Sequence, residues 1–436
     1  MKNFPDTRVT DPHRRSLLGA ALAGALSTAT LSLGAFGATT NANRFVFVIL
    51  RGGLDGLSAA PAPGDPGFAD ARGALASFAS PTLALDATFA LHPALAQLHA
   101  MYGRGELALV HATGLPYRER SHFDAQQVLE SGGARPFEIS TGWLGRALAP
   151  AHTRSVALST TVPLVLRGPG VVDTWAPSSS PTSSNGTLDA TAELVARLEP
   201  LYAADPALAT ALQRAKALHL DDAMPADTAD MAGAAGAAGA AGSAGMAGAA
   251  GMAANDASPG PARRGNFTVL ARRAADFLSQ PGGAQAAVLE LGGWDTHANQ
   301  TNPNGALGYG LRQLDTGLAA LRDGLAAGGA WGRTVIVVAT EFGRQVAMNG
   351  TLGTDHGSGG AAFVLGGAVR GGRVIADWPG LAPRDRYQGR DLRTTTDLRA
   401  VLKGVLADHL QVASRALNIE VFPGSEAVQG LSLVKG

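Results

Sequence analysis

The chain has 436 residues, 46% of them hydrophobic, and its 35 basic and 35 acidic side chains give a formal net charge of zero. This size predicts a substantial core in one large domain or two. The balanced charge argues against a protein that binds the phosphate backbone of nucleic acid. The absence of cysteine excludes disulfides, zinc–thiolate sites, a cysteine nucleophile and a bacterial lipoprotein anchor.

The N-terminus carries a pattern that is typical of export. Arg14 and Arg15 precede a weakly apolar run over residues 17–38 that ends in small residues. Paired arginines before such a run indicate a twin-arginine signal, which the export machinery reads. The alternative is a transmembrane helix, but glycines and hydroxyl residues interrupt a run that is barely long enough to span a bilayer. We therefore expect residues 1–40 to be a signal segment and the mature protein to be periplasmic or secreted, without a stable membrane anchor.

Apolar runs and helical patterns alternate from about residue 41. Near-continuous apolar runs predict strands that are covered on both faces. The strands expected in the first half are 44–50, 107–111, 156–158 and 164–166. The helices expected there are 92–102, 119–130 and 187–218, and the second of these has Phe123, Val128 and Leu129 on its apolar face.

Residues 225–262 interrupt this alternation. Residues 231–252 are almost entirely alanine and glycine. Such a segment cannot bury a core, and each glycine costs a helix about 1 kcal/mol relative to alanine. We expect a flexible surface insertion within a single domain that spans residues 41–436.

The alternation resumes after the insertion. We expect helices at 267–278, 307–327 and 396–410, strands at 286–291 and 334–339, and a further strand pair or hairpin at 361–369 and 372–375. The helix at 307–327 has one apolar stripe, formed by Leu311, Leu314, Leu318, Leu321 and Leu325. Alternating strands and helices predict an α/β fold with a mostly parallel central sheet and helices on both faces.

Acidic and imidazole side chains follow three of these strands in glycine-rich motifs. Ligands of open parallel sheets bind beyond the carboxyl ends of the strands, and these side chains suit hard or borderline divalent metals. The candidate metal ligands are Asp55, Asp295, His297, Glu341, Asp355 and His356.

Simpler roles exist for three of these residues. Asp55 could cap the backbone of its own turn. His297 could hydrogen-bond the neighbouring Asp295, and Glu341 could form an ion pair with Arg344.

The segment after the second strand offers candidate catalytic groups. Ser121 could be a helix N-cap or, at a helix start near metals, an activated nucleophile. His122 and Asp124 could be further ligands or a pair that orients a hydroxyl. Arg118 and Arg120 could clamp an oxyanion through paired hydrogen bonds.

The remaining histidines lack acidic companions at ligand spacing. We interpret His92, His99, His152 and His219 as structural or surface residues. His111 lies at a strand end, and its role stays open.

Four sequence motifs together resemble the exported family called domain of unknown function 1501. They are Leu-Arg-Gly-Gly-Leu-Asp-Gly-Leu at 50–57, Arg-Ser-His-Phe-Asp-Ala-Gln at 120–126, Gly-Gly-Trp-Asp-Thr-His at 292–297, and Thr-Glu-Phe-Gly-Arg with Gly-Thr-Asp-His-Gly at 340–357. The resemblance covers roughly residues 44–434, and the family is similar to the alkaline phosphatase and sulfatase superfamily. It implies an alkaline-phosphatase-like sheet with a two-metal site that hydrolyses phosphate or sulfate esters.

The motifs also depart from that superfamily's pattern. One residue separates Asp295 from His297 where three are usual, and Glu341-Phe342 stands where Asp-His is common. Gly114 stands where a sulfatase has its modified residue, which argues against a formylglycine sulfatase. Thr113 is therefore an alternative hydroxyl to Ser121.

We expect an exported metal-dependent hydrolase of small-molecule phosphate or sulfate esters. It would use one or two divalent ions (Zn, Mn, Mg or Ca), which neutralise charge on the attacking and leaving oxygens. Ser121 or a water molecule activated by the metal would attack, with Arg118 or Arg120 on the non-bridging oxygens. The alternative is a non-catalytic exported binding or assembly protein. An oxidoreductase is disfavoured because no dinucleotide-binding glycine motif is present.

Overall fold

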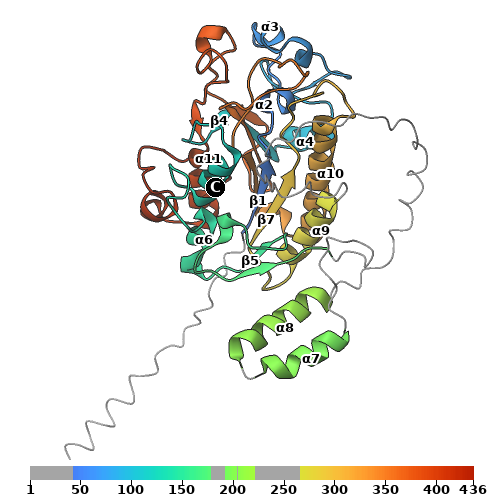
Figure 1. Ribbon diagram of the computed structural model, residues 1–436, viewed down its shortest axis with the longest axis vertical. Coiled ribbons are helices and arrows are strands. Elements are labelled where there is room, and N and C mark those ends of the chain that lie inside the picture. Colours follow the sequence, from blue (N-terminus) through green and yellow to red (C-terminus); the bar gives the residue numbers. More distant parts are fainter. Residues whose placement is uncertain (1–42, 178–191, 204, 221–265) are drawn as a thin grey trace, which may run out of the picture. The chain divides into compact units, whose positions relative to one another are not determined.

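The computed structural model describes residues 43–177, 192–203, 205–220 and 266–436 (Figure 1). The compact unit to which they belong spans Asn43–Gly436. The expected signal segment and the Ala/Gly-rich insertion lie outside the described residues. Among the residues described, no helix has both the length and the apolar character needed to cross a bilayer.

A nine-stranded sheet forms the centre of this unit. Its order is β10-β4-β9-β8-β1-β7-β5-β6, with β11 beside β4. Only β9 is antiparallel to its neighbours, so the sheet is mostly parallel, as predicted. The strands are β1 (Arg44–Arg51), β4 (Leu107–Gly114), β5 (Ser155–Ala157), β6 (Val172–Thr174), β7 (Ala286–Gly292), β8 (Thr334–Thr340), β9 (Gly360–Leu365), β10 (Arg373–Ile375) and β11 (Thr396–Asp397), with a separate pair of β2 (Leu83–Ala84) and β3 (Ala90–Leu91).

The segments 361–369 and 372–375 do not form the expected hairpin. β9 pairs with β8 and β4, whereas β10 pairs in parallel with β4, which therefore lies between them. Leu107, Ala108 and Leu109 of β4 are fully buried, as is usual for an inner strand that has a partner on each edge. A sequence pattern that shows only adjacent strands cannot reveal such an insertion.

The central strand β1 is covered on both faces. Val46, Val48 and Leu50 pack into a cluster with residues of α4 (Ala96–Gly103), α9 (Asn266–Ser279) and α10 (Ala306–Ala327). Phe45, Phe47 and Ile49 alternate with them and pack with residues of α5 (His122–Ser131), α6 (Trp143–Leu148) and α11 (Leu398–Leu410). Because neighbouring side chains of a strand point to opposite faces, the unbroken apolar run of β1 fits helices on both sides of the sheet.

Helices account for the layers on each side of the sheet (Figure 1). The helices of the described residues are α2 (Gly56–Ala59), α3 (Phe68–Arg72), α4 (Ala96–Gly103), α5 (His122–Ser131), α6 (Trp143–Leu148), α7 (Ala192–Tyr202), α8 (Pro206–Leu220), α9 (Asn266–Ser279), α10 (Ala306–Ala327), α11 (Leu398–Leu410) and α12 (Ser414–Ala416), and α7 and α8 pack against each other. The five leucines of the predicted stripe on α10 are all buried. Asp397 caps α11, because its carboxylate accepts a hydrogen bond from the backbone N–H of Arg399 at 2.8 Å.

Three local predictions differ from the structure. Residues 164–166 form a 3₁₀ helix rather than a strand. The helix expected at 187–218 is two helices, since α7 ends at Tyr202 and Pro206 starts α8. Phe123 is 56% exposed, so it does not belong to the buried face of α5.

Candidate metal centre

The loops that follow three parallel strands meet at one edge of the sheet. Leu50 of β1 is in register with Leu291 of β7 and with Thr340 of β8, so these strands end together. Gly52 has φ +119°, and a Cβ atom there would lie 2.6 Å from the backbone nitrogen of Asp295. A glycine at this position therefore allows the loop after β1 to contact the loop after β7.

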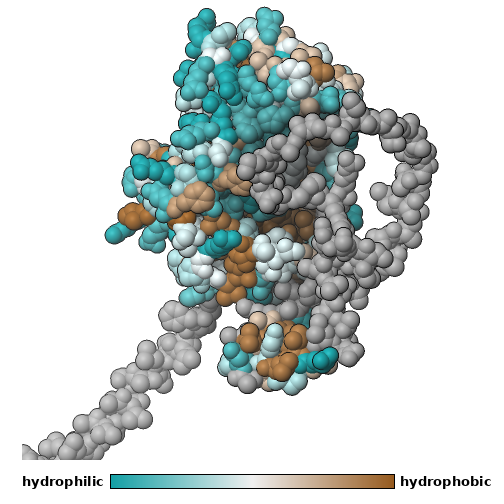
Figure 2. Space-filling model, viewed as in Figure 1, coloured by the Kyte–Doolittle hydropathy of each residue, from teal (hydrophilic) through white to brown (hydrophobic). Residues whose placement is uncertain are grey.

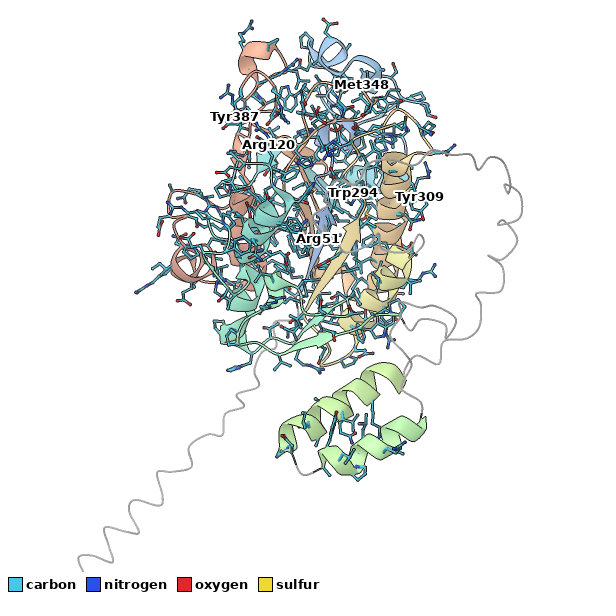
Figure 3. The ribbon with its side chains drawn as sticks, viewed as in Figure 1. Arg51, Arg120, Trp294, Tyr309, Met348 and Tyr387 are labelled. Carbon is cyan, nitrogen blue, oxygen red and sulfur yellow. The ribbon has the colours of Figure 1, made fainter. Side chains whose placement is uncertain are left out.

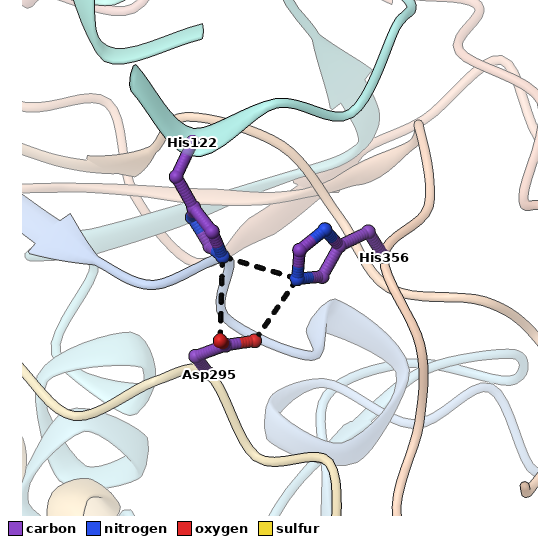
Figure 4. A group of neighbouring side chains, drawn as sticks. All are labelled: His122, Asp295 and His356. Carbon is purple, nitrogen blue, oxygen red and sulfur yellow. Dashed lines mark hydrogen bonds and ion pairs between the residues drawn. The ribbon is translucent and has the colours of Figure 1, made fainter. Parts of the chain in front are cut away.

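Three side chains from distant segments converge at this edge (Figure 4). His122 is the first residue of α5, Asp295 follows β7, and His356 precedes β9. Their potential ligand atoms all lie within 4.8 Å of one another. His122 Nε2 lies 3.1 Å from His356 Nε2 and 3.4 Å from Asp295 Oδ2, and His356 Nε2 lies 3.1 Å from Asp295 Oδ1.

His297 brings a third imidazole to the same place. Its Nε2 atom lies 2.9 Å from Asp295 Oδ1 and 3.1 Å from His356 Nε2. Asp295 and His297 therefore direct their side chains to one site, as their spacing predicted. The structure brings together four side chains that could hold a metal ion, and we call this candidate site the metal centre: His122, Asp295, His297 and His356.

The other ring nitrogen of each histidine faces a hydrogen-bond acceptor. An acceptor at Nδ1 requires Nδ1 to carry the proton, so Nε2 of a neutral ring presents a lone pair. The Nδ1 contacts are His122 to Glu341 Oε1 at 2.9 Å, His297 to Asp355 Oδ1 at 3.1 Å, and His356 to the carbonyl oxygen of Arg120 at 3.0 Å.

This arrangement fits a bound cation. Three imidazole lone pairs and a carboxylate face one another, and acceptors in contact repel unless a positive group lies between them. One proton on a single Nε2 would satisfy only one of these contacts. A divalent ion can bind the three nitrogen lone pairs and the carboxylate together. Metal-bound histidines in proteins also usually have a hydrogen-bond acceptor at the other ring nitrogen, as these three do at Nδ1.

The electrostatics of the site also favour a positive charge there. Burial opposes the charge of His122, yet hydrogen bonds and charges of Asp295 and Glu341 raise the pKa of its imidazole to about 9. Partial burial likewise disfavours the Asp295 carboxylate, but its interactions with His122, His356 and Arg344 hold its pKa well below the usual range. Asp295 is thus ionised, as a metal ligand must be.

Arg344 and Asn349 hold the loops that carry the ligands. The buried guanidinium of Arg344 donates to Asp295 Oδ1 at 2.6 Å and also to the backbone oxygen of Thr354. The side-chain amide of Asn349 donates to Asp355 Oδ1 at 3.1 Å and to the carbonyl of His297 at 3.0 Å. Neither role could be predicted from the sequence, because an arginine and an asparagine in a glycine-rich loop carry no distinguishing local signal.

Glu341 lies behind the metal centre instead of in it. Its carboxylate is 1% exposed and accepts hydrogen bonds from His122, the backbone of Gly52, Gln126 and Thr340. Burial raises its pKa, but these hydrogen bonds outweigh burial and lower it. Glu341 therefore orients His122, and the suggested ion pair with Arg344 does not form, since Arg344 pairs with Asp295.

Asp55 belongs to a separate buried cluster. One of its carboxylate oxygens accepts from Arg72 at 2.6 Å, Ser58 at 2.8 Å and Gln300 at 2.9 Å. The other oxygen caps α2 by accepting from the backbone of Leu57 and Ser58. Every acceptor position is thus used within the protein, which matches the capping alternative and leaves Asp55 outside the metal centre.

The candidate catalytic residues make other contacts. Ser121 is at the N-cap position of α5 and makes no capping hydrogen bond. Arg118 donates to Thr394 at 2.8 Å. Arg120 pairs with the buried Asp391 at 2.7 Å and lies 5.9 Å from the ring centre of Tyr387 (Figure 3). In the described residues, no hydrogen bond or ion pair joins these three side chains to the metal centre.

The two remaining polar candidates near the site also lie outside the ligand set. Asp124 accepts a hydrogen bond from the Tyr117 hydroxyl at 2.9 Å, so of the His122–Asp124 pair only His122 joins the metal centre. The hydroxyl of Thr113 is buried and has no hydrogen-bond partner among the described residues.

His111 is a core residue. Its Nε2 atom lies 2.8 Å from the carbonyl of Ala60, and its ring stacks on Phe89 at 5.3 Å and meets Trp378 edge-on at 5.0 Å. Burial lowers the pKa of this imidazole to about 4. His111 therefore stays neutral and serves packing, which settles the role that its sequence position left open.

Residues 42–420 match the family described as protein of unknown function, DUF1501. The chain belongs to this family. The match covers most of the chain and includes all four motifs of the predicted resemblance. No curated protein matches the chain.

Three solved structures illustrate the similarity in fold. Ps i-CgsB bound to k-i-k-neocarrahexaose is 9% identical, covers 89% of this chain and 74% of its own, and has a TM-score of 0.41. A 2-O GAG sulfatase is 12% identical over 89% and 73%, with a TM-score of 0.37. The phosphonate monoester hydrolase of Agrobacterium radiobacter is 11% identical over 85% and 74%, with a TM-score of 0.38. At such values the likeness carries no argument about the site or its activity.

Proposed function

We propose that this protein is a metal-dependent hydrolase of phosphate or sulfate esters. The observation that supports this most is the convergence of three Nε2 atoms on Asp295, at distances of 2.9–3.4 Å. The site lies at the carboxyl edge of a mostly parallel sheet, where open α/β folds bind their ligands. The side chains of His297 and Asp295 are 45% and 42% exposed, so a small substrate can reach the centre.

We propose a single ion of the Zn²⁺ type. Imidazole ligands suit Zn²⁺ and similar transition metals, whereas Mg²⁺ and Ca²⁺ prefer oxygen ligands. The carboxylates that a second ion would need are engaged elsewhere. Glu341 and Asp355 each accept a hydrogen bond from a histidine Nδ1–H, and Asp55 pairs with Arg72. Of the one or two ions expected from the sequence, we therefore propose one.

The residues of the chain provide a pre-organised setting for the reaction. A bound ion would supply Lewis acidity, polarising an ester oxygen and stabilising the charge that develops on it. Glu341, Asp355 and the Arg120 carbonyl hold the three imidazoles in one tautomer and orientation. Arg344 compensates part of the Asp295 charge and fixes that carboxylate against the loop at Thr354.

The test measures metal and activity in the same preparations. Full-length protein is purified and analysed for metal, then assayed with 4-nitrophenyl phosphate and 4-nitrophenyl sulfate with and without added Zn²⁺. We expect about one zinc per chain and zinc-dependent turnover. His356→Asn should lose both, whereas the control His152→Asn, which removes an exposed histidine outside the centre, should keep both. Metal-free protein with no zinc response would overturn the proposal.

A second candidate is a metal-binding protein without catalytic activity. One observation favours it: the side chains of Arg118 and Arg120 are engaged away from the metal centre. The same assay separates the candidates, because this one expects bound zinc, loss of zinc in His356→Asn, and no turnover of either ester.

We also propose export through the twin-arginine pathway, on the strength of Arg14 and Arg15 before the apolar run. Cell fractionation tests this. The wild-type protein should reach the periplasm or medium, and Arg14→Lys/Arg15→Lys should remain in the cytoplasm. A double variant that is exported as efficiently as wild type would contradict the proposal.

A further inference from the structure

A cavity lies close to the carboxyl edge of the sheet, outside the metal centre. It has a volume of about 240 Å³ and is formed by the loop after residue 76, the segment before α4, and the loop that leads into α10. None of the four metal-centre residues lines it. The part of the molecule that carries α3, at the top of the view in Figure 2, is largely hydrophilic on the face shown there.

The cavity wall offers hydrogen-bond donors. Arg312 uses one guanidinium nitrogen to donate to the carbonyl of Pro303 at 2.7 Å, which leaves the others for a ligand. Asn302 uses its side-chain oxygen to accept from Asn304 at 3.0 Å, which leaves its NH₂ group to donate. The hydroxyls of Ser77 and Ser80 also line the space.

His92 adds a further donor without adding a charge. Its Nδ1 atom accepts from the backbone of Ala94 at 3.0 Å, so Nε2 of the neutral ring carries the proton. Burial, with the nearby charge of Arg312, lowers the pKa of His92 to about 4, which keeps the ring neutral near pH 7. In the described residues, no hydrogen bond occupies this Nε2–H.

The lining contains no aspartate or glutamate. Its sixteen residues include one arginine and one histidine, and the rest are hydroxyl, amide or apolar residues. A wall of donors with one cation and no carboxylate favours an anion, because charge-assisted hydrogen bonds are stronger than neutral ones. Apolar side chains such as Leu75, Phe78 and Leu307 face the same space and can contact a carbon skeleton.

The floor of the cavity is fixed before any ligand arrives. Ser58 and Gln300 line it, are both buried, and are both hydrogen-bonded to Asp55. A rigid floor lowers the entropic cost of ordering side chains on binding. The buried Asp55 cluster therefore has a local purpose, which is to hold this surface in shape.

We propose that this cavity binds a small organic anion, a compound with a carboxylate or phosphate group on a hydroxylated carbon skeleton of about monosaccharide size. The anionic group contacts Arg312 and the His92 Nε2–H, and the skeleton lies against Phe78 and Leu75. The volume is just below the roughly 300–1,000 Å³ of sites for drug-sized ligands, which sets the size limit. This site is independent of the proposed hydrolase activity.

Calorimetric titration of the full chain tests the charge requirement. The probes are glucose 6-phosphate, gluconate and glucose, which separate phosphate, carboxylate and neutral ligands. Either anion should bind at least about tenfold more tightly than glucose, since hydrogen bonds to charged groups are worth about 1.5–3 kcal/mol. Phosphate esters and gluconate also bind divalent ions, so the titrations are repeated in His356→Asn, where binding to the cavity should persist. Equal affinity for glucose and both anions, or loss of all binding in His356→Asn, would overturn the proposal.

Variants of the cavity locate the binding. Arg312→Gln should weaken anion binding at least about tenfold. The control Arg322→Gln removes an arginine from the same helix but outside the cavity and should not weaken it. Ala94→Phe fills the space while Arg312 stays in place, and it should abolish binding. Unchanged affinity in both Arg312→Gln and Ala94→Phe would show that the anion binds elsewhere.

Discussion

Asp55 and Asp295 are both aspartates at the carboxyl edge of the sheet, yet their surroundings differ in kind. The side chain of Asp55 is 2% exposed and faces only donors, including Arg72, Ser58 and Gln300. The side chain of Asp295 is 42% exposed and faces three imidazole Nε2 atoms besides Arg344. The number of donors around a carboxylate thus distinguishes a structural aspartate from a candidate ligand better than its position after a strand.

The two clusters are also connected. Gln300 donates to Asp55 and accepts from the Thr354 hydroxyl at 2.6 Å, and Thr354 accepts from Arg344 at 3.2 Å. Arg344 then reaches Asp295. The buried cluster therefore supports the loop on which the metal centre depends, although it contributes no ligand itself.

The largest expected effect follows from removing the Asp55 carboxylate. Asp55→Ala leaves the fully buried Arg72 without its partner, which typically costs about 3–5 kcal/mol of unfolding free energy. Asp55→Ala/Arg72→Met should recover part of this loss because the buried charge is gone. Urea unfolding followed by tryptophan fluorescence measures both. Folded Asp55→Ala should still bind one zinc, so a variant of normal stability that lacks zinc would make Asp55 a ligand after all.

Seven of the nine strands of the central sheet could be predicted from the sequence, whereas β6 and β11 could not, and residues 164–166 form a 3₁₀ helix instead of the expected strand. The site could be predicted only in part. The unbroken apolar runs at 44–50 and 334–339 identify buried strands because both of their faces are covered. The partners of a carboxylate, in contrast, come from segments far away in the chain. Arg72 is 17 residues from Asp55, and Glu341 is 219 residues from His122. No local pattern shows which of these contacts form.

The second effect is the dependence of stability on acidic pH, which tests whether His111 is buried and neutral. His111 has a pKa of about 4 when folded and about 6.5 when unfolded, so the unfolded chain binds the proton first as pH falls. Its contribution is fully present above pH 6.5 and is lost as pH falls through 4. Between pH 7 and pH 5 we expect a loss of about 2 kcal/mol from this residue.

The measurement compares urea unfolding of wild type and His111→Gln at these two pH values in metal-free protein. Glutamine keeps a donor that can reach the Ala60 carbonyl but does not titrate. The variant should therefore lose about 2 kcal/mol less than wild type over this range. An identical pH dependence would mean that His111 is not buried and neutral, and that it is available for the chemistry that its strand-end position left open.

The smallest expected effect is a change in zinc affinity on substituting Glu341. It tests whether this carboxylate only orients His122 or binds the ion itself. Glu341→Gln keeps the shape and leaves an oxygen to accept from His122 and Gly52, while its amide can donate to Thr340 Oγ1, which donates in turn to Leu50. Loss of the charge makes His122 a weaker ligand. Residues behind a metal site typically change its affinity 10- to 100-fold, and the retained hydrogen bonds favour the lower end, about tenfold or 1.4 kcal/mol.

Competition with a chelator of known zinc affinity measures this change. The matched control is Glu130→Gln, since Glu130 is also buried and pairs with Arg51 rather than with a histidine. The control should leave zinc affinity unchanged. A loss in Glu341→Gln as large as that in His356→Asn would mean that the carboxylate binds the ion directly, and the set of ligands would then extend to the end of β8 and make room for a second ion.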